Sequence, residues 1–297
     1  MRRRSEVAWS LAAVGAACAA LLAMAGAAWA AQKDAARPAD AASVDLKRLD
    51  AFYADASAPN IAGFWRPAPG VARQVYTFLD GTPLPLRDDT GQDGWPYRPE
   101  WRAAYEARRA ADRAGAPFGD PTASCWPPGL YKAYIAALTP LEITQTPGRV
   151  QMNHERAFPV RRIFTDGTSH PEGEALEYTL NGHSVGHWDG DTLVVDSVGL
   201  RRETTLSTAP GLPHSEKLHV VERLTRVDPV TLLIEVILDD PKAMTQPVRT
   251  TLLYKLWLDD RMSEEICEEN NRNQPNADLV VETQIGTHKR YGYDLPQ

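Results

Sequence analysis

The chain lacks the short motifs that identify most cofactor-dependent enzymes. Its 297 residues contain no glycine-rich dinucleotide or phosphate loop, no H-E-x-x-H zinc motif and no paired C-x-x-C. Residues 182–186 (GHSVG) match the G-x-S-x-G nucleophile pattern, but without the alternating strands and helices in which that motif works. His183 and His187 would chelate a metal on a helix, whereas an extended chain separates them by about 13 Å. The sequence therefore predicts no cofactor and no metal site.

Excess positive charge is also missing. The chain has 32 Lys and Arg against 39 Asp and Glu, for a net charge of −7, and loss of residues 1–30 would change it to −9. Nucleic-acid binding and adhesion to anionic lipid both depend on concentrated Lys and Arg. We therefore expect no nucleic acid as a partner, and no membrane once residues 1–30 are removed.

Long apolar runs are confined to the first thirty residues. Three arginines at positions 2–4 precede an apolar stretch over residues 7–25, which ends at Ala28-Trp29-Ala30. A basic start, an apolar core and an A-x-A end are typical of a Sec-type secretory signal. The alternative is a membrane anchor, for which the apolar stretch is only marginally long. The sequence predicts a signal peptide over residues 1–30, cleavage near Ala30, and a periplasmic or secreted protein.

Cysteine is scarce, and one of the three cysteines, Cys18, lies within the predicted signal peptide. Two thiols remain, Cys125 and Cys267, and two thiols in an oxidising compartment most often pair. A disulfide between them is therefore expected. The alternative is two buried, unpaired thiols.

Composition divides the remaining chain into three parts. Residues 31–48 are rich in Ala, Asp and Pro and read as a flexible leader. Residues 49–124 are rich in loops, with one helix expected over residues 99–113, where a proline begins the first turn and Gly115 follows the end. Residues 125–297 are expected to form a β-barrel domain.

Alternating apolar residues and turn dipeptides predict about eight strands after Cys125. Short turns join most of them, so an antiparallel meander is expected. About eight strands can close into a lipocalin-like barrel wide enough for one small ligand, and an open sandwich is the alternative. The fold class is therefore mainly β, preceded by one helix and long loops. The expected strands cover residues 141–145, 149–154, 160–165, 184–188, 192–198, 217–227, 231–239 and 248–257.

A set of motifs from Cys125 to Arg272 resembles a family of exported bacterial proteins, mostly proteobacterial. The resemblance implies one folded, exported unit and no particular chemistry. Residues 130–132 (LYK) depart from the Met-Pro-Arg expected there, which bears on the pocket or its specificity. The matching stretches are CWPPG at 125–129, QTPGRV at 145–150, RRIFTDG at 161–167 with HP at 170–171, GHSVGHWDGDTLVVD at 182–196, PHSE at 213–216, ER at 222–223, DP at 240–241 and CEENNR at 267–272.

Four expected strands each place one ionisable residue on an otherwise apolar face: His154, Arg162, Asp196 and Glu222. The last strand adds Tyr254. Side chains of a strand alternate between its faces, so these groups are expected to meet inside the barrel. One interpretation makes His154 or Glu222 a general base, Arg162 an anion clamp and Tyr254 a proton donor, with Asp196 as a further ligand-binding residue. The alternative is a buried Arg162–Glu222 ion pair that fixes strand register.

His214 and Glu216 lie on one side of an extended segment, about 7 Å apart at the backbone. They are candidate ligand-binding residues, and a solvated surface loop is the alternative.

These observations favour an exported β-barrel that binds a small, partly apolar molecule beside a His/Arg/Glu/Asp cluster. One hypothesis adds cofactor-free acid–base chemistry of the isomerase, lyase or hydratase type. A non-catalytic ligand-binding protein and an envelope structural protein are the alternatives, and the sequence does not fix the oligomeric state.

Overall fold

The computed structural model describes residues 55, 57–68, 75–85, 94–115, 122, 125–135, 140–155, 157–207, 211–258, 261–263, 282–283, 286–287 and 296. The predicted signal peptide and leader, residues 1–48, lie outside these described residues, as does Cys267. The helices and strands, in chain order, are β1 (Gly63–Pro67), β2 (Tyr76–Thr77), α2 (Pro99–Arg113), α3 (Leu130–Ile135), β3 (Leu141–Thr146), β4 (Arg149–His154), β5 (Ala157–Phe164), the 3-10 helix η3 (Gly173–Ala175), β6 (His183–Asp189), β7 (Thr192–Val198), β8 (His219–Asp228), β9 (Thr231–Asp239), β10 (Val248–Leu256), β11 (Glu282–Thr283) and β12 (Gly286–Thr287).

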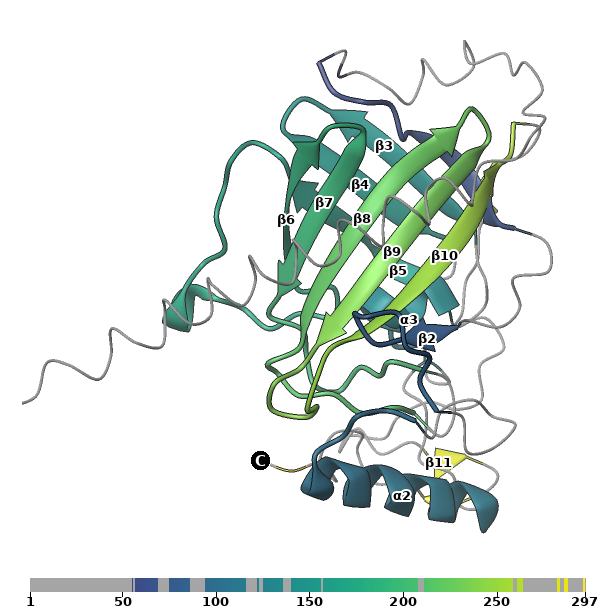
Figure 1. Ribbon diagram of the computed structural model, residues 1–297, viewed down its shortest axis with the longest axis vertical. Coiled ribbons are helices and arrows are strands. Elements are labelled where there is room, and N and C mark those ends of the chain that lie inside the picture. Colours follow the sequence, from purple (N-terminus) through teal and green to yellow (C-terminus); the bar gives the residue numbers. More distant parts are fainter. Residues whose placement is uncertain are drawn as a thin grey trace, which may run out of the picture.

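Nine strands of the main sheet close into a barrel (Figure 1). The order around its wall is β1-β3-β4-β5-β6-β7-β8-β9-β10, and the short β2 pairs with β10 on the outside of this ring. Strand β1 closes the ring, because Gly63 pairs with Ile143 of β3 and Trp65 pairs with Leu256 of β10. The expected barrel is confirmed. Its ninth strand, β1, comes from the stretch 49–124, for which the sequence analysis expected loops and one helix.

One pair of neighbouring strands departs from the expected antiparallel meander. Strands β5 and β6 are parallel, and their register contains two pairs, Ile163 with Ser184 and Phe164 with Val185. Strand β6 begins only at His183, so the earlier part of β5 has no β6 residue opposite it. We call this place in the barrel wall the β5–β6 seam.

The parallel pairing arises because the turn after β5 does not lead straight into a hairpin. The turn itself forms as its Asp-Gly dipeptide predicts: the carboxylate of Asp166 accepts a hydrogen bond from the backbone N–H of Thr168 at 3.0 Å, and Gly167 has a φ of 87°. The chain then continues through η3, which lies away from the barrel in Figure 1, before it returns as β6.

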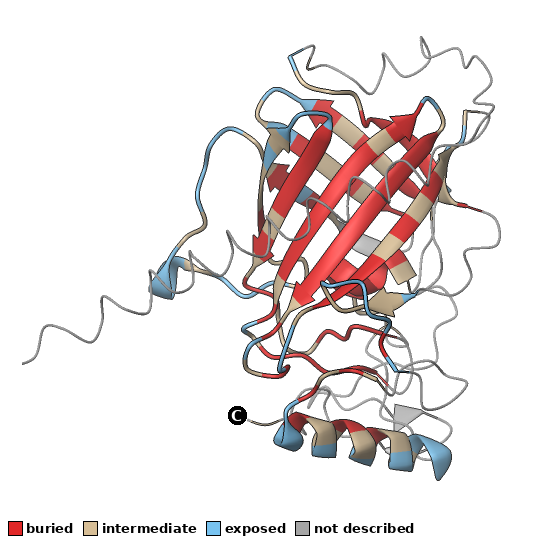
Figure 2. Cartoon of the chain, in the orientation of Figure 1, coloured by how far each residue is buried: buried red, intermediate tan, exposed pale blue. Residues whose placement is uncertain are grey.

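The interior of the barrel is a packed apolar core. Alternate residues of β8 and β9 point inward, among them Val220, Leu224, Ile234 and Val236, each fully buried. Figure 2 shows both strands buried along nearly their whole length. Each such side chain contributes about 1.5–3 kcal/mol when removed from water. The described side chains of β8 and β9 therefore fill their part of the barrel interior.

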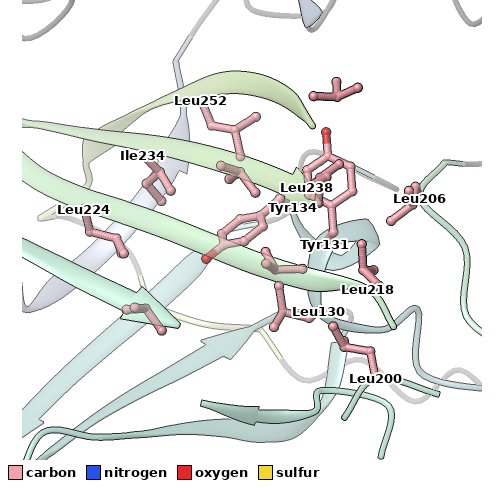
Figure 3. Packing of buried hydrophobic residues seen from close by; sticks show 14 of the residues in the cluster. Leu130, Tyr131, Tyr134, Leu200, Leu206, Leu218, Leu224, Ile234, Leu238 and Leu252 are labelled. Carbon is pink, nitrogen blue, oxygen red and sulfur yellow. The ribbon is translucent and has the colours of Figure 1, made fainter. Parts of the chain in front are cut away.

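A short helix that the sequence analysis did not expect, α3, contributes two tyrosines to this core. Tyr131 and Tyr134 reach among apolar side chains of β8, β9 and β10 (Figure 3). Gly129, just before the helix, has a φ of 86°, and a Cβ there would lie 2.7 Å from Thr204. Only glycine fits this entry to the helix without strain.

The one expected helix, α2, is confirmed with its predicted bounds. Its buried face carries Trp101, Tyr105 and Arg108, at helical spacing. Arg108 donates to the backbone oxygen of Gly211 at 2.9 Å, which ties α2 to the loop before β8. Within the described part of the chain, no helix combines the length and the apolar character needed to cross a membrane.

Candidate functional site

A buried ion pair crosses the barrel interior between β5 and β8. The guanidinium of Arg161 donates to both carboxylate oxygens of Glu222, and the bond from NH1 to Oε1 is 2.9 Å long. Tyr134 of α3 donates its hydroxyl to the same Oε1 at 2.6 Å. Burial acts to lower the pKa of Arg161, but the charge and hydrogen bonds of Glu222 raise it above its ordinary value. Arg161 therefore stays charged.

Two serines complete this network. Arg161 donates from Nε to Ser184 Oγ at 3.2 Å and from NH2 to Ser197 Oγ at 2.9 Å, and the two serine oxygens lie 2.8 Å apart. Glu222, predicted to point inward, does so. Its oxygens are occupied by Arg161 and Tyr134, an arrangement typical of a structural ion pair.

The prediction that Arg162 points into the barrel is wrong by one residue. Arg161 and Ile163 are buried, while Arg162 is exposed on the outer face. The sequence allowed either face of β5 to point inward, because one face carries the apolar residues Val160 and Phe164 beside Arg162 and the other carries Ile163 beside Arg161. The inner position goes to the arginine that Glu222 can neutralise, since an unpaired buried charge is costly.

His154 is buried at the end of β4, as expected, but its chemistry differs from that of a general base. Its ring meets the ring of Tyr134 edge-on at 4.9 Å, and its Nδ1 is buried without a hydrogen bond. Burial, with a further effect from the charge of Arg161, lowers the pKa of His154 to about 3. At neutral pH the ring is therefore uncharged and a weak base.

Tyr254 also points inward and is buried on β10. Burial raises the pKa of its hydroxyl above the ordinary value. Among the expected interior residues, the structure thus brings together Glu222, His154 and Tyr254 in a packed core.

The structure separates His214 from Glu216. His214 is buried, with Nε2 2.7 Å from Thr204 Oγ1 and Nδ1 2.8 Å from the backbone oxygen of Ser215. Glu216 turns to the surface and pairs with Lys242 at 3.0 Å. Their expected action as two arms around one ligand is therefore not supported: both ring nitrogens of His214 and the carboxylate of Glu216 have partners.

A cavity of about 510 Å³ lies at the β5–β6 seam, a volume within the range of small-molecule sites. Three arginines line it: Arg161, Arg162 and Arg201. His183, at the start of β6, and the aromatic rings of Phe164 and Tyr178 also line it. No acidic residue is among the described residues of its lining. We call this cavity the seam pocket.

The three arginines of the seam pocket differ in their partners. Arg161 is committed to Glu222, as described above. Arg201 lies over the ring of Trp126 at 5.3 Å and within 3.4 Å of Glu203. The side chain of Arg162 forms no hydrogen bond or ion pair with any described residue and is exposed. The pocket therefore combines apolar walls with an accessible positive charge.

Asp196 does not point into the barrel, which corrects the expectation for that residue. Its β7 neighbours Val195 and Ser197 are buried inside, so Asp196 faces outward. It accepts hydrogen bonds from Nε2 of His219, on β8, at 2.8 Å and from Nε2 of His170 at 3.2 Å.

The contacts of Asp196 extend to the seam pocket. Nδ1 of His170 lies 2.9 Å from Nδ1 of His183, whose ring stacks on Phe164 at 5.4 Å. We call this series of side chains joined by hydrogen bonds, in the order His219, Asp196, His170 and His183, the histidine chain. No group of three or more His, Cys, Asp or Glu side chains in the described ranges has the arrangement of a metal site. The contacts described for the histidine chain are hydrogen bonds between its side chains.

Three members of the histidine chain have shifted pKa values: those of Asp196 and His183 are lowered, and that of His219 is raised. Burial acts to raise the pKa of Asp196, but the hydrogen bonds from His170 and His219 outweigh it and hold that pKa well below its ordinary value. Burial acts to lower the pKa of His219, yet Asp196 raises it. At the other end, burial and then the charge of His170 lower the pKa of His183. His183 is therefore a neutral base at neutral pH.

Several of these residues were missed or set aside by sequence reasoning. His170, His219 and Arg201 lie in loops or near strand ends, where alternation carries no signal. His183 was considered only as a metal ligand with His187, which is exposed on the same strand. The usable signal was that His170, His183 and Asp196 all fall within the motifs quoted above.

The expected Cys125–Cys267 bridge cannot be described at both ends, because Cys267 lies outside the described residues, and the bridge stays a prediction. Comparison with models of known protein families found no match, and comparison with curated proteins found none. Membership of a family of exported bacterial proteins likewise stays a prediction. The fold and the site define a β-barrel protein with an arginine-lined pocket in its wall.

Proposed function

We propose that this is an exported protein that binds a small, partly apolar carboxylic acid in the seam pocket. The observation that carries the proposal is the lining of that pocket: three arginines and one histidine, no described acidic residue, and the rings of Phe164 and Tyr178. Arginine matches the geometry of a carboxylate and forms charge-assisted hydrogen bonds with it. The aromatic rings suit an apolar body on the same molecule.

Within this proposal the arginines have different parts. Arg162, whose exposed side chain has no partner among the described residues, binds the carboxylate, and Arg201, which also lines the pocket, assists it. Arg161 keeps its bond to Glu222 and fixes the inner wall. Arg162 thus retains the anion-clamp role expected from the sequence, at the outer face of the barrel instead of its interior.

The interior ion pair favours a structural role for Glu222. Its oxygens accept from Arg161 and Tyr134 in a packed core, so no substrate is needed to explain their burial. We interpret the ion pair of Glu222 and Arg161 as a structural contact that fixes the position of β5 relative to β8. We therefore assign ligand binding to the seam pocket and not to Glu222.

Binding of phenylacetate, measured by isothermal titration calorimetry, tests the proposal. Wild-type protein should bind the acid more tightly than neutral phenylacetamide, and more weakly as salt is added, because exposed charges are screened. Arg162→Ala should weaken phenylacetate binding by about 10-fold or more, since a hydrogen bond to a charged group contributes about 1.5–3 kcal/mol.

Arg113→Ala is the matched control. Arg113 is an exposed arginine at the end of α2 and is not part of the pocket lining, so its removal changes the net charge equally. This variant should bind as the wild type does. Equal affinity for the acid and the amide, or equal losses in the two arginine variants, would contradict a carboxylate site at the seam.

A further inference from the structure

The histidine chain ends at the wall of the seam pocket. His183 lines the pocket, and its Nδ1 is the nitrogen that contacts His170. Its other nitrogen, Nε2, has no hydrogen bond with a described residue. Stacking on Phe164 holds the plane of the ring. One nitrogen of a fixed histidine is therefore left for whatever occupies the pocket.

The hydrogen bonds determine which proton each ring carries. The carboxylate of Asp196 accepts, so both His170 and His219 bear a proton on Nε2. A neutral His170 then has its lone pair on Nδ1 and accepts from Nδ1–H of His183. This leaves the lone pair of His183 on Nε2. An acceptor carboxylate that sets the tautomer of a histidine is the arrangement that catalytic bases use.

We infer that His183 is the general base of a cofactor-free proton transfer on a 2-oxo carboxylic acid bound in the seam pocket, with His170 and Asp196 as positioning residues. This inference rests on the proposed function, because it needs the acid to be bound there. A 2-oxo acid has a carbon-bound proton next to its carbonyl group, and His183 can remove such a proton without any other reactant.

The step balances within the substrate and the histidine chain. His183 Nε2 takes the proton from C3, and the electron pair of the C–H bond forms the C2–C3 double bond while the carbonyl oxygen becomes an enolate. The Nδ1 proton of His183 passes to Nδ1 of His170. The resulting imidazolium of His170 is hydrogen-bonded to ionised Asp196. The proton held by His170 and His183 exchanges with solvent, and its return from Nε2 of His183 to C3 restores the keto acid and both neutral rings.

The charged groups around the histidine chain favour this direction of transfer. Arg162 and Arg201 line the pocket and provide positive charge where the enolate forms. At the far end, Asp239 of β9 lies close enough to influence the charge of His219. Asp196 lies between His219 and His170, so negative charge is concentrated on the side of the histidine chain away from the pocket.

Exchange of the C3 protons of phenylpyruvate in D₂O, followed by NMR, tests the inference with the full chain. Wild-type protein should accelerate exchange above the uncatalysed rate. His183→Ala should reduce that acceleration by about 100-fold or more, the usual effect of losing a general base. His187→Ala is the matched control, because His187 is an exposed histidine of the same strand outside the pocket lining, and it should leave the rate unchanged.

His170→Asn tests positioning by a readout that folding alone would not change. Wild-type exchange should increase as pH rises through the pKa of His183, because only the neutral ring is a base. A proton taken up by either ring of the His170–His183 pair removes the lone pair from Nε2 of His183, and the charge of a protonated His170 lowers the pKa of His183. Removing the imidazole of His170 removes this coupling, so the acid limb of the pH–rate profile should move and should follow the titration of one histidine instead of two. An unmoved limb in His170→Asn would overturn the part assigned to His170.

The binding and exchange measurements distinguish carboxylate binding from proton transfer by His183. Phenylacetate binding that is normal in His183→Ala, together with lost exchange, supports the inference. Binding without accelerated exchange in the wild type overturns the inference and leaves the binding function standing. Absence of binding of both phenylacetate and phenylpyruvate overturns the proposed function and the inference together.

Discussion

At the scale of single residues, Arg161 shows how one side chain joins many parts of the barrel. From β5 its guanidinium reaches Glu222 on β8, Ser184 on β6 and Ser197 on β7. The sequence offered two adjacent arginines and correctly indicated that one would meet Glu222. It could not indicate which, because strand alternation fixes the faces only relative to each other. Partners far away in sequence decide between Arg161 and Arg162.

His154 provides a residue-scale prediction about pH. Its pKa is lowered to about 3 in the folded protein, whereas an unfolded histidine has a pKa of about 6.5. The unfolded chain therefore binds a proton between these values and the folded chain does not. Stability from this residue is complete above about pH 6.5 and is lost as pH falls, by up to about 1.4 kcal/mol per unit.

We expect His154→Phe to remove this loss. In urea unfolding at several pH values, the free energy of unfolding of the variant should gain on the wild type by about 1.4 kcal/mol per pH unit between about pH 6 and 4. His187→Phe, at an exposed position, should show no such trend. A constant difference between His154→Phe and the wild type would contradict a buried neutral histidine.

At the scale of elements, the sequence predicted what is local and missed what depends on distant partners. The hairpin of β6 and β7 and that of β8 and β9 follow from alternation on both sides of a turn, and the expected ranges agree with the observed strands. The parallel β5–β6 seam, strand β1 and helix α3 depend on neighbours far along the chain. The seam pocket, which exists because β6 begins late, could not be predicted for the same reason.

The ion pair between β5 and β8 gives an element-scale prediction. Glu222→Leu leaves the guanidinium of Arg161 buried without its carboxylate, so the free energy of unfolding should fall by about 3–5 kcal/mol. The double variant Arg161→Met, Glu222→Leu removes both charges and should recover most of that loss. Urea unfolding measures all three proteins. A single variant within about 1 kcal/mol of the wild type would contradict a structural pair.

At the scale of the whole molecule, stability and the proposed function depend on different parts of the barrel. The described interior holds apolar side chains and the Arg161–Glu222 network, and α3 packs among them. Helix α2 packs against the loop before β8, at one end of the barrel. The groups to which we assign binding and proton transfer lie on the outer wall, around the β5–β6 seam. The sequence indicated the barrel and several polar residues of the site, but placed their meeting point inside. The structure instead places Arg162 and Asp196 outside the barrel, near the β5–β6 seam, where the strand register contains two pairs.

Export and the expected disulfide make the prediction at this scale. If residues 1–30 are a cleaved signal peptide, mass spectrometry of protein from the periplasmic fraction of a Gram-negative host should give a chain that starts at Ala31.

In that oxidising compartment Cys125 and Cys267 should form one disulfide, so the intact mass should be two hydrogens lower than that of the reduced chain. Cys125→Ser should lower the free energy of unfolding by up to about 4–5 kcal/mol, because the closed loop is long. The reduced wild type is the control and should match the variant. Two free thiols in the exported protein would rule out the bridge, and a chain that retains residues 1–30 would rule out cleavage.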